Sequence, residues 1–346
     1  MSISMAVATE AERVVLAEGD WTSGILPGGS HAMSSRCHSH QTFSTPETDG
    51  PWITVCPAKK RSKRCGNPYT GIAEKEKELR WILEEEVHNI LGSLYSTLKE
   101  VCRFFPMSDV KEECHVKQEN FKLSATTSDA VKGVLTLQGD TLCQVDLHMK
   151  LSKQSQPLHT FFRGDKRWKM QQIQDAGNHL HLALQLVSSH DKKYEFCSGA
   201  EVNKLMESVL QQLNRARNRL TIPAAMTLPD LVNTNGAKMF NPPLPSDVLV
   251  NFYVHHNKLC LILYQVHPLQ TNLNKNFKAA GGSVCHSPGA MFEYGGQKLE
   301  ISHTHKVEST VSWLNQVLLY TTLALQLSQQ LRDKVSVFEN YWTKHY

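Results

Sequence analysis

The sequence predicts an α+β protein in which an antiparallel four-helix bundle accompanies a separate antiparallel β-sheet domain. Long segments near both ends of the chain place apolar residues three, four or seven apart, which is the spacing of helices that bury one stripe. Between them lie two groups of strand-like segments, separated by two further helical segments. We therefore expect an elongated two-domain molecule. Its N- and C-terminal helices should join the two central helices, while both groups of strands complete one sheet.

The last helix is the longest predicted element and covers residues 308–342. No glycine or proline interrupts it, and a helix of this length runs roughly 50 Å at about 1.5 Å per residue. It needs a neighbour of similar length, which residues 72–105 provide. A coiled-coil seam is the alternative for that neighbour, but its apolar spacing drifts between three and four and its apolar face is wide, which favours a multi-helix bundle. Pro106 ends this helix.

A segment at residues 19–73 looks like an insertion into the first helix. Of its 55 residues, 25 are Gly, Pro, Ser or Thr, and no helical or strand period persists, which predicts disorder. The preceding residues 11–18 stop in mid-helix, and residues 76–91 look like their continuation. A basic tract at residues 59–64 is either a nuclear-import signal or a solvated stretch without a receptor.

Strands are predicted where β-forming residues alternate with polar ones. The first group has Gly139 and Asp140 as a hairpin turn, and its segments are residues 119–123, 131–138, 142–149 and 158–163. A proline-rich loop leads to the second group, which has a hairpin around residues 255–257. Its segments are residues 248–254, 259–266 and 298–304. The two central helices are predicted at residues 173–187 and 202–220, and Ser198 with Glu201 predicts a capping box before the second helix.

These elements give the expected domain organisation. The bundle domain comprises residues 1–18, 74–110, 170–222 and 308–346, and the β domain comprises residues 111–169 and 223–307. The core of the bundle should be built from apolar residues on the facing helix stripes. These residues are Leu83, Val87, Ile90, Leu94, Leu98, Leu184, Leu205, Val209, Leu213, Leu318, Leu325, Leu331, Val335 and Phe338.

Composition and charge exclude several classes of protein. With 346 residues, of which 40% are hydrophobic and 20% charged, the chain has the composition of a soluble protein. No apolar run approaches the ~20 residues of a membrane span, and the first residues lack the basic start of a secretion signal, so we expect a cytoplasmic protein. The nine cysteines contain no CxxC pair, which predicts reduced thiols. Outside residues 19–73, 31 basic residues nearly balance 30 acidic ones, so no nucleic-acid partner is expected.

The candidate metal sites are weak in this sequence. His303 and His305 share one face of a predicted strand, but no cysteine or acidic ligand accompanies them at a suitable spacing. A solvated strand face is the better interpretation. His179 and His181 are two apart on a helix and therefore point to different sides. We expect no metal site and no cofactor.

No catalytic residue can be assigned either. The glycine-rich residues 279–296 lack the GxxxxGK[ST] and GxGxxG spacings of phosphate-binding loops, and a mobile or tightly turned loop is favoured. Cys285 and His286 could resemble a nucleophile with its base, but adjacent residues rarely present their side chains to each other. Ser287 does not lie in a GxSxG turn. We therefore expect a protein that is not an enzyme, and an enzyme with its site in this loop ranks last.

Eight stretches together resemble the Rogdi family, the leucine-zipper-like proteins of animals, over roughly residues 76–343. They are KQENFKL (117–123), VKGVLTLQGD (131–140), KMQQIQDAGNH (169–179), RARNRLT (215–221), PSDVLVN (245–251), NKLCL (257–261), HSPGAMFE (286–293) and HKVE (305–308). The resemblance implies a helical bundle built from both ends of the chain and a separate β domain. Residues 19–73 have no counterpart in the family pattern.

The resemblance also implies a non-enzymatic function. Rogdi-like proteins are similar to the small subunit of RAVE and rabconnectin assemblies, which help the cytosolic sector of the vacuolar proton-pumping ATPase rejoin its membrane sector. The implied partners are a large scaffold protein of rabconnectin type and peripheral V-ATPase subunits, with the chain monomeric outside that complex. Implied locations are the cytoplasm, synaptic vesicles and the nuclear envelope, with a role in neurodevelopment. The alternative is a nuclear regulatory zipper-like protein, although Pro68 and Gly71 interrupt any basic region that would run into the helix.

Overall fold

The computed structural model describes residues 68–105, 118–123, 130–152, 155–269 and 277–345. The chain divides into two compact units, residues 1–74 and residues 75–346. In the first unit only the beginning of one helix is described. The second unit mixes helices with two antiparallel sheets, as expected for an α+β protein.

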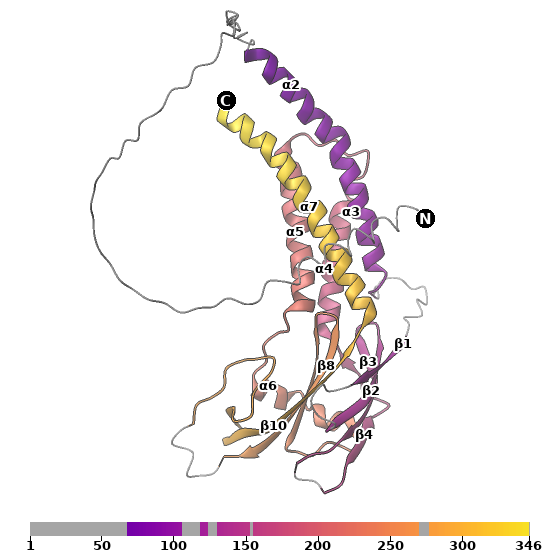
Figure 1. Cartoon of the computed structure of the whole chain (residues 1–346), viewed down its shortest axis with the longest axis vertical. Coiled ribbons are helices and arrows are strands. Elements are labelled where there is room, and N and C mark those ends of the chain that lie inside the picture. Colours follow the sequence, from indigo (N-terminus) through magenta and orange to yellow (C-terminus); the bar gives the residue numbers. More distant parts are fainter. Residues whose placement is uncertain (1–67, 106–117, 124–129, 153–154, 270–276, 346) are drawn as a thin grey trace, which may run out of the picture. The chain divides into compact units, whose positions relative to one another are not determined.

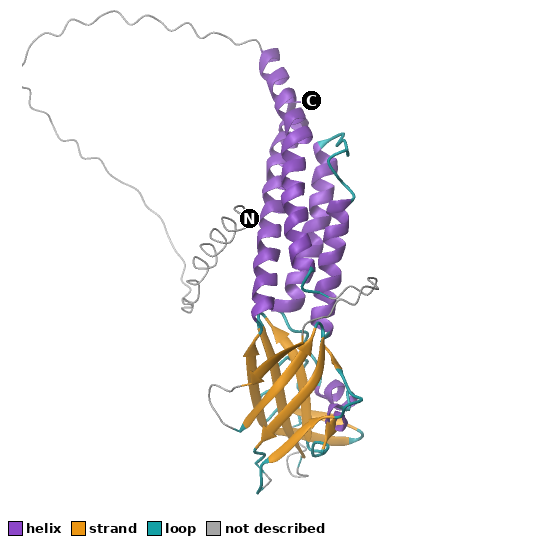
Figure 2. Ribbon diagram, turned by 90° about the vertical axis from the view of Figure 1, so that its right-hand side faces the viewer, coloured by secondary structure: helices purple, strands orange, loops and turns teal. Residues whose placement is uncertain are grey.

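The helices of the second unit lie side by side at one end of the sheets (Figures 1 and 2). Along the chain they are the end of α2 (Pro68–Trp81, of which residues 75–81 belong to this unit), the short π-helix η1 (Ile82–Glu86), α3 (Val87–Cys102), α4 (Gln171–Ser188), α5 (Gly199–Thr221) and α7 (Ser312–His345). Helices α3 and α5 each pack against both α4 and α7. Helix α7, of 34 residues, is therefore held by segments from the beginning and the middle of the chain.

Most of the apolar residues on the facing stripes of these helices are buried. The fully or nearly fully buried ones are Val87, Leu94, Leu98, Leu205, Val209, Leu213, Leu331 and Val335. The partly buried ones that pack against this core are Leu83, Ile90, Leu184, Leu318, Leu325 and Phe338. Burial of each such side chain stabilises the fold by about 1.5–3 kcal/mol relative to an exposed position.

Close contact between α3 and α4 depends on a glycine. A Cβ atom at Gly177 of α4 would lie 2.8 Å from the ring of Phe105, which follows α3. The same ring meets Trp313 of α7 edge-on, with centroids 6.0 Å apart. Phe105 therefore fills the space where three helices meet, and a side chain at Gly177 would displace it.

Helix boundaries near both ends of the chain differ from the prediction. Helix α3 ends at Cys102, whereas the sequence predicted a helix up to residue 105. The last helix begins at Ser312 and not at residue 308, because strand β10 (Gln297–Thr310) continues through residue 308 to pair with β8. The first described helix begins at Pro68, so residues 68–73, which were assigned to the inserted segment, are helical. Residues 11–18 and 19–67, including the basic tract, lie outside the described residues.

The strands form two sheets, whereas the sequence predicted one. The six-stranded sheet contains β1 (Gln118–Leu123), β2 (Val131–Gln138), β3 (Thr141–Met149), β4 (Leu158–Phe162), β5 (Trp168–Lys169) and β6 (Phe240–Asn241). The four-stranded sheet contains β7 (Val248–His255), β8 (Lys258–Pro268), β9 (Met291–Tyr294) and β10. Strand β6, which follows α5 in sequence, pairs with β4 and so belongs to the six-stranded sheet.

The reason for two sheets is that β7 and β8 are buried on both faces. On one face, Val250, Leu261 and Leu263 belong to a single core that includes the six-stranded sheet and the helices. On the other face, Ile262 and Tyr264 belong to a second core. Helix α6 (Leu228–Asn233) and the segment around residues 280–292 cover this second core. A strand with two apolar faces needs a layer on each side.

The turns and helix caps agree with the sequence prediction more closely than the sheets do. Gly139, at φ 59°, forms the predicted turn between β2 and β3, and residues 256–257 form the turn between β7 and β8. The predicted cap of α5 is only half present. The Ser198 hydroxyl accepts a hydrogen bond from the Glu201 amide, but the Glu201 carboxylate binds the amide of Cys197. A complete capping box occurs at α6, a helix that lies within the predicted proline-rich loop.

Candidate interaction surface on the six-stranded sheet

The outer face of the six-stranded sheet carries a row of exposed side chains. The register pairs one residue from each of five adjacent strands, and all five are exposed: Lys122, Val134, Asp146, Phe161 and Asn241. The alternate residues of the same strands point inward to the core. We call the outward-facing set of five the outer row. It mixes charge with apolar area, since Val134 is 38% exposed and Phe161 45% exposed.

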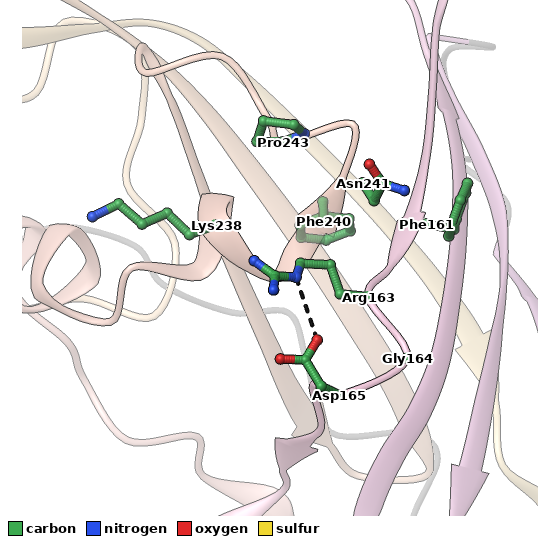
Figure 3. A pocket seen from close by; sticks show the side chains of 8 residues that line it. All are labelled: Phe161, Arg163, Gly164, Asp165, Lys238, Phe240, Asn241 and Pro243. Atoms are coloured by element: carbon green, nitrogen blue, oxygen red, sulfur yellow. Dashed lines mark ion pairs between the residues drawn. The ribbon is translucent and has the colours of Figure 1, made fainter.

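A hollow of about 630 Å³ lies at the Phe161 end of the outer row (Figure 3). One wall comes from β4 and the turn after it, and the other from the 3-10 helix η2 (Gly236–Met239), β6 and the residues that follow. The lining residues are Phe161, Arg163, Gly164, Asp165, Lys238, Phe240, Asn241 and Pro243. We call this the β4–β6 hollow. Aromatic residues line it and charged residues surround it. Protein–protein interfaces commonly have this arrangement of an apolar centre with a polar rim.

The walls of the hollow are fixed to the core. The amide of Arg163 donates to the carbonyl of Met239 over 2.9 Å, and the hydroxyl of Thr160 donates to the carbonyl of Pro242. Beneath them, the rings of Phe162 and Phe240 meet edge-on with centroids 4.9 Å apart. The hollow is therefore pre-formed, which lowers the ordering cost of binding.

The rim carries more positive than negative charge. Nε of Arg163 lies 3.3 Å from the Asp165 carboxylate, and Nζ of Lys166 lies 3.3 Å from its other oxygen. The hydrogen bond from Lys166, together with the charge of Arg163, lowers the pKa of Asp165, so this carboxylate stays ionised at neutral pH. Lys238 makes no ion pair within the part of the chain that the structure describes. The rim therefore favours a partner segment that carries acidic side chains.

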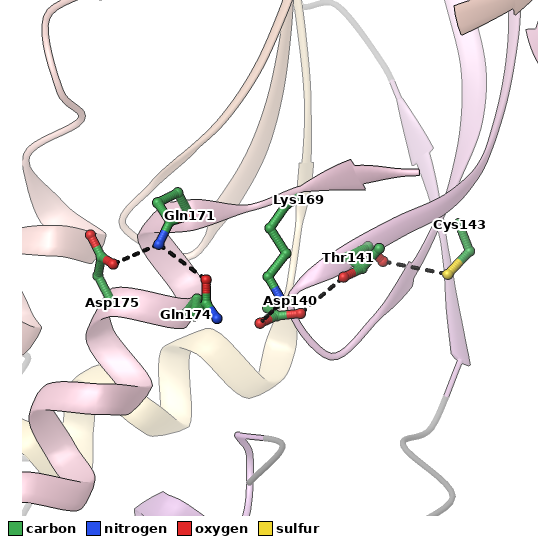
Figure 4. Close-up of polar contacts among 7 residues, drawn as sticks. All are labelled: Asp140, Thr141, Cys143, Lys169, Gln171, Gln174 and Asp175. Carbon is green, nitrogen blue, oxygen red and sulfur yellow. Dashed lines mark hydrogen bonds and ion pairs between the residues drawn. The ribbon is translucent and has the colours of Figure 1, made fainter. Parts of the chain in front are cut away.

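A cluster of polar side chains joins the six-stranded sheet to the start of helix α4 (Figure 4). Asp140, only 8% exposed, binds Nζ of Lys169 over 2.6 Å and accepts a hydrogen bond from Thr141. The amide of Met170, which precedes α4, donates to the Asp140 carbonyl over 2.8 Å. Gln171, in the first turn of α4, donates to Asp175. This group fixes the β2–β3 turn to the start of α4, so its role is structural.

The histidines singled out in the sequence differ in their surroundings. His303 is exposed, but Nε2 of His305 and Nε2 of His181 are buried without a hydrogen-bond partner among the described residues, so the strand face is less solvated than predicted. The rings of His303 and His305 are 6.4 Å apart, and within the described residues no third ligand joins them. Nδ1 of His179 pairs with the side chain of Gln212 on α5 over 2.9 Å. His181 instead bonds the carbonyl of Gly177 within its own helix. The two helical histidines therefore point to different sides.

The glycine-rich segment contains a strand and no assembled nucleophile. Residues 291–294 form β9, and Gly295 with Gly296 forms the turn into β10. His286 is 4% exposed, and its ring pairs with the carbonyl of Met226, whereas Cys285 is exposed. The two side chains thus have separate partners, as expected for neighbours in sequence.

Neither the outer row nor the hollow follows from the sequence pattern. The hollow joins residues 161–165 to residues 238–243, which are brought together by the pairing of β4 with the two-residue strand β6. A strand of two residues leaves no periodic signal. The available signal was Phe161, an aromatic residue at an outward position of a strand whose neighbouring positions face inward.

Among the described residues, no helix combines the length and the apolar character needed to cross a membrane.

The family model described as Rogdi leucine zipper containing protein matches residues 78–336 of the chain. Zebrafish (Danio rerio) protein rogdi homolog is 57% identical over 267 residues, which cover 77% of this chain and 94% of the zebrafish protein. The human protein rogdi homolog is 55% identical over 268 residues, covering 78% of this chain and 93% of that protein. The Drosophila melanogaster protein rogdi is 35% identical over 265 residues, covering 76% and 88% respectively.

Proposed function

Because this chain belongs to the Rogdi family, we propose that it is a non-enzymatic adaptor or scaffold subunit that assists assembly of the vacuolar proton-pumping ATPase through a RAVE- or rabconnectin-type complex. Its partners in this proposal are a large scaffold protein of rabconnectin type and peripheral V-ATPase subunits. The site of action in this proposal is the cytoplasm, with association with synaptic vesicles and the nuclear envelope. The observation that carries the proposal is the family match over residues 78–336, which includes both the helices and the sheets.

The physical mechanism is that of a rigid spacer. In our proposal α3, α4, α5 and α7 act as one antiparallel four-helix bundle, and the sheets act as a β domain fixed to it. Support comes from the main core, in which residues of the helices, such as Leu94, and of both sheets, such as Leu147 and Leu261, form one continuous cluster. A continuous core resists bending between its parts. Partners bound at the two ends are thereby held at a fixed separation.

Docking to the scaffold protein is assigned to the outer row and the β4–β6 hollow. Phe161 supplies exposed aromatic area, while Arg163 and Lys238 outnumber Asp165 on the rim. Aromatic and arginine side chains next to a pocket are the usual energetic centre of a protein interface. An acidic segment that inserts one apolar side chain would satisfy both features.

The nuclear zipper alternative has less support. A zipper needs an exposed leucine seam, but Leu91, Leu94 and Leu98 of α3 are at most 2% exposed and belong to the main core. The basic tract at residues 59–64 lies outside the described residues. High-affinity, salt-dependent binding to duplex DNA would revive this alternative.

The test is affinity purification of the full-length chain from neuronal cells, followed by quantitative mass spectrometry. The wild type should recover a rabconnectin-type scaffold together with peripheral V-ATPase subunits. A Phe161→Ser, Lys238→Glu double variant should lose at least about 90% of this recovery, because removal of an interface anchor costs about 2 kcal/mol or more. Tyr95→Ser, at a residue 40% exposed on α3, is the matched control and should recover the wild-type amounts.

Two outcomes separate the parts of this proposal. If the wild type recovers neither the scaffold nor pump subunits, the adaptor function is wrong. If the wild type recovers them and the double variant does so equally well, the adaptor function stands and the docking surface lies elsewhere. Thermal melting of the purified double variant establishes that it is folded before either result is interpreted.

A further inference from the structure

Two histidines and an aspartate meet on the outer face of the six-stranded sheet. Asp146 and His148 are two residues apart on β3, so their side chains leave the same face. His159 on β4 lies directly opposite His148 in the antiparallel register. All three side chains are exposed. Three potential metal ligands therefore share one small area held by two hydrogen-bonded strands.

Their ligand atoms converge. One oxygen of Asp146 lies 2.9 Å from Nε2 of His159 and 3.7 Å from Nε2 of His148. One ligand atom from each residue lies within 4.8 Å of the other two. Within the described residues, this is the one group of three or more His, Cys, Asp or Glu side chains that meets this condition. By comparison, His303 and His305 share a strand face without a third ligand.

These separations suit a single small cation. Zinc binds imidazole nitrogen and carboxylate oxygen at about 2.0–2.2 Å, which places neighbouring tetrahedral ligands about 3.3 Å apart. The two separations to the Asp146 oxygen lie on either side of that value. Because the side chains are exposed, small rotations can aim both nitrogens at one point without moving the strands.

The two rings stack on neighbouring strands. The rings of His148 and His159 are parallel to within 5°, with centroids 4.0 Å apart. The lone pair of a neutral imidazole lies in the plane of its ring, so the stacked rings must turn toward each other before both nitrogens can bind one ion. Both side chains are exposed, which leaves room for this rotation.

We propose that Asp146, His148 and His159 bind one divalent transition-metal ion of the zinc class on the outer face of this sheet. Three protein ligands leave a fourth tetrahedral position open to water or to a ligand from another molecule. Phe161, which lines the β4–β6 hollow, is the direct cross-strand partner of Asp146. The open position thus lies on the same face as the outer row.

The test uses the full-length protein, stripped with a chelator and titrated with zinc chloride by calorimetry at neutral pH. His159→Gln and His148→Gln should each lose one zinc equivalent, or bind it at least about tenfold more weakly, because a ligand is removed. His256→Gln is the matched control, at an exposed histidine in the β7–β8 turn, and should bind zinc as the wild type does.

A second measurement uses cobalt(II) in place of zinc and records visible absorption. The wild type should gain the absorption bands of a low-coordinate cobalt site, and both ligand variants should lack them while the His256→Gln control retains them. Melting curves without metal should be unchanged for all variants, since the substituted side chains are exposed. Equal zinc stoichiometry and affinity in the wild type, His148→Gln and His159→Gln would overturn the proposal.

Discussion

The two sheets of this protein differ in what covers them. The four-stranded sheet is enclosed at β7 and β8, which contribute to the main core on one face and to a second core under α6 on the other. Its other two strands, β9 and β10, carry some exposed side chains. The six-stranded sheet buries one face and leaves the outer row exposed on the other. The enclosed sheet links the layers of the molecule, and the open sheet offers a surface to other molecules. Sites for partners should therefore be sought on the six-stranded sheet.

The largest expected effect is in the enclosed sheet. Leu261→Ala should reduce the free energy of unfolding by about 2–5 kcal/mol, because Leu261 is 0% exposed and its removal leaves a cavity in the main core. Val134→Ala, on the open face, should change it by less than about 1 kcal/mol. Chemical denaturation of both variants measures the difference. Equal losses of unfolding free energy in the two variants would show that the two sheets do not differ in burial at these positions.

Substitution of a glycine tests how closely β2 and β3 of the six-stranded sheet approach each other. A Cβ atom at Gly133 of β2 would lie 2.2 Å from the carbonyl oxygen of Asp146 on β3. Gly133→Ala should therefore force the strands apart and cost about 1–3 kcal/mol. Gly92→Ala, where a Cβ atom would meet nothing within 4 Å on α3, should instead stabilise by about 0.5–1 kcal/mol. Denaturation midpoints that move in the same direction for both would contradict this account.

A smaller, pH-dependent effect is expected at His305 of the four-stranded sheet. Burial, with a further contribution from His303, lowers the pKa of His305, and Nε2 of His305 has no hydrogen-bond partner within the described residues. Below pH ~6.5 the unfolded chain binds a proton that the folded chain resists, so stability falls as the pH falls.

His305→Gln should therefore flatten the decrease in melting temperature between about pH 7 and pH 5. Differential scanning calorimetry in chelator-containing buffer measures the decrease for the wild type and the variant. A decrease that is equally steep in both would show that His305 does not titrate differently in the folded and unfolded states.

The smallest effect on stability is expected on the open sheet. Phe161→Ser removes a side chain that is 45% exposed, so the unfolding free energy should change by less than about 1 kcal/mol. Recovery of the scaffold partner should fall nonetheless. A large loss of stability would mean that Phe161 supports the fold, and the outer row would then lose its interpretation as a surface for partners.

The sequence predicted what local patterns determine. The helices, the two hairpin turns and most strands follow from apolar period and turn residues. The near-continuous apolar runs of β7 and β8 also signalled burial on both faces, although one sheet was expected. Likewise, Thr227, Pro229 and Asp230 mark the start of α6 within the proline-rich loop.

The surface features could not be predicted in the same way. His148 and His159 become neighbours only through the register of β3 and β4, and the β4–β6 hollow needs a pairing across about eighty residues of sequence. Register depends on the whole buried face and not on the residues that it happens to place opposite each other outside. A site on an exposed sheet face is thus a product of tertiary structure.

The junction between β10 and α7 has a mechanical consequence. Strand β10 ends at Thr310 and α7 begins at Ser312, while the amide of Val311 between them donates to the carbonyl of Asn257 over 2.8 Å. No slack connection separates the two elements. A force on the four-stranded sheet is consequently transmitted directly into a helix roughly 50 Å long. Because α7 packs against α3 and α5, these helices share that load.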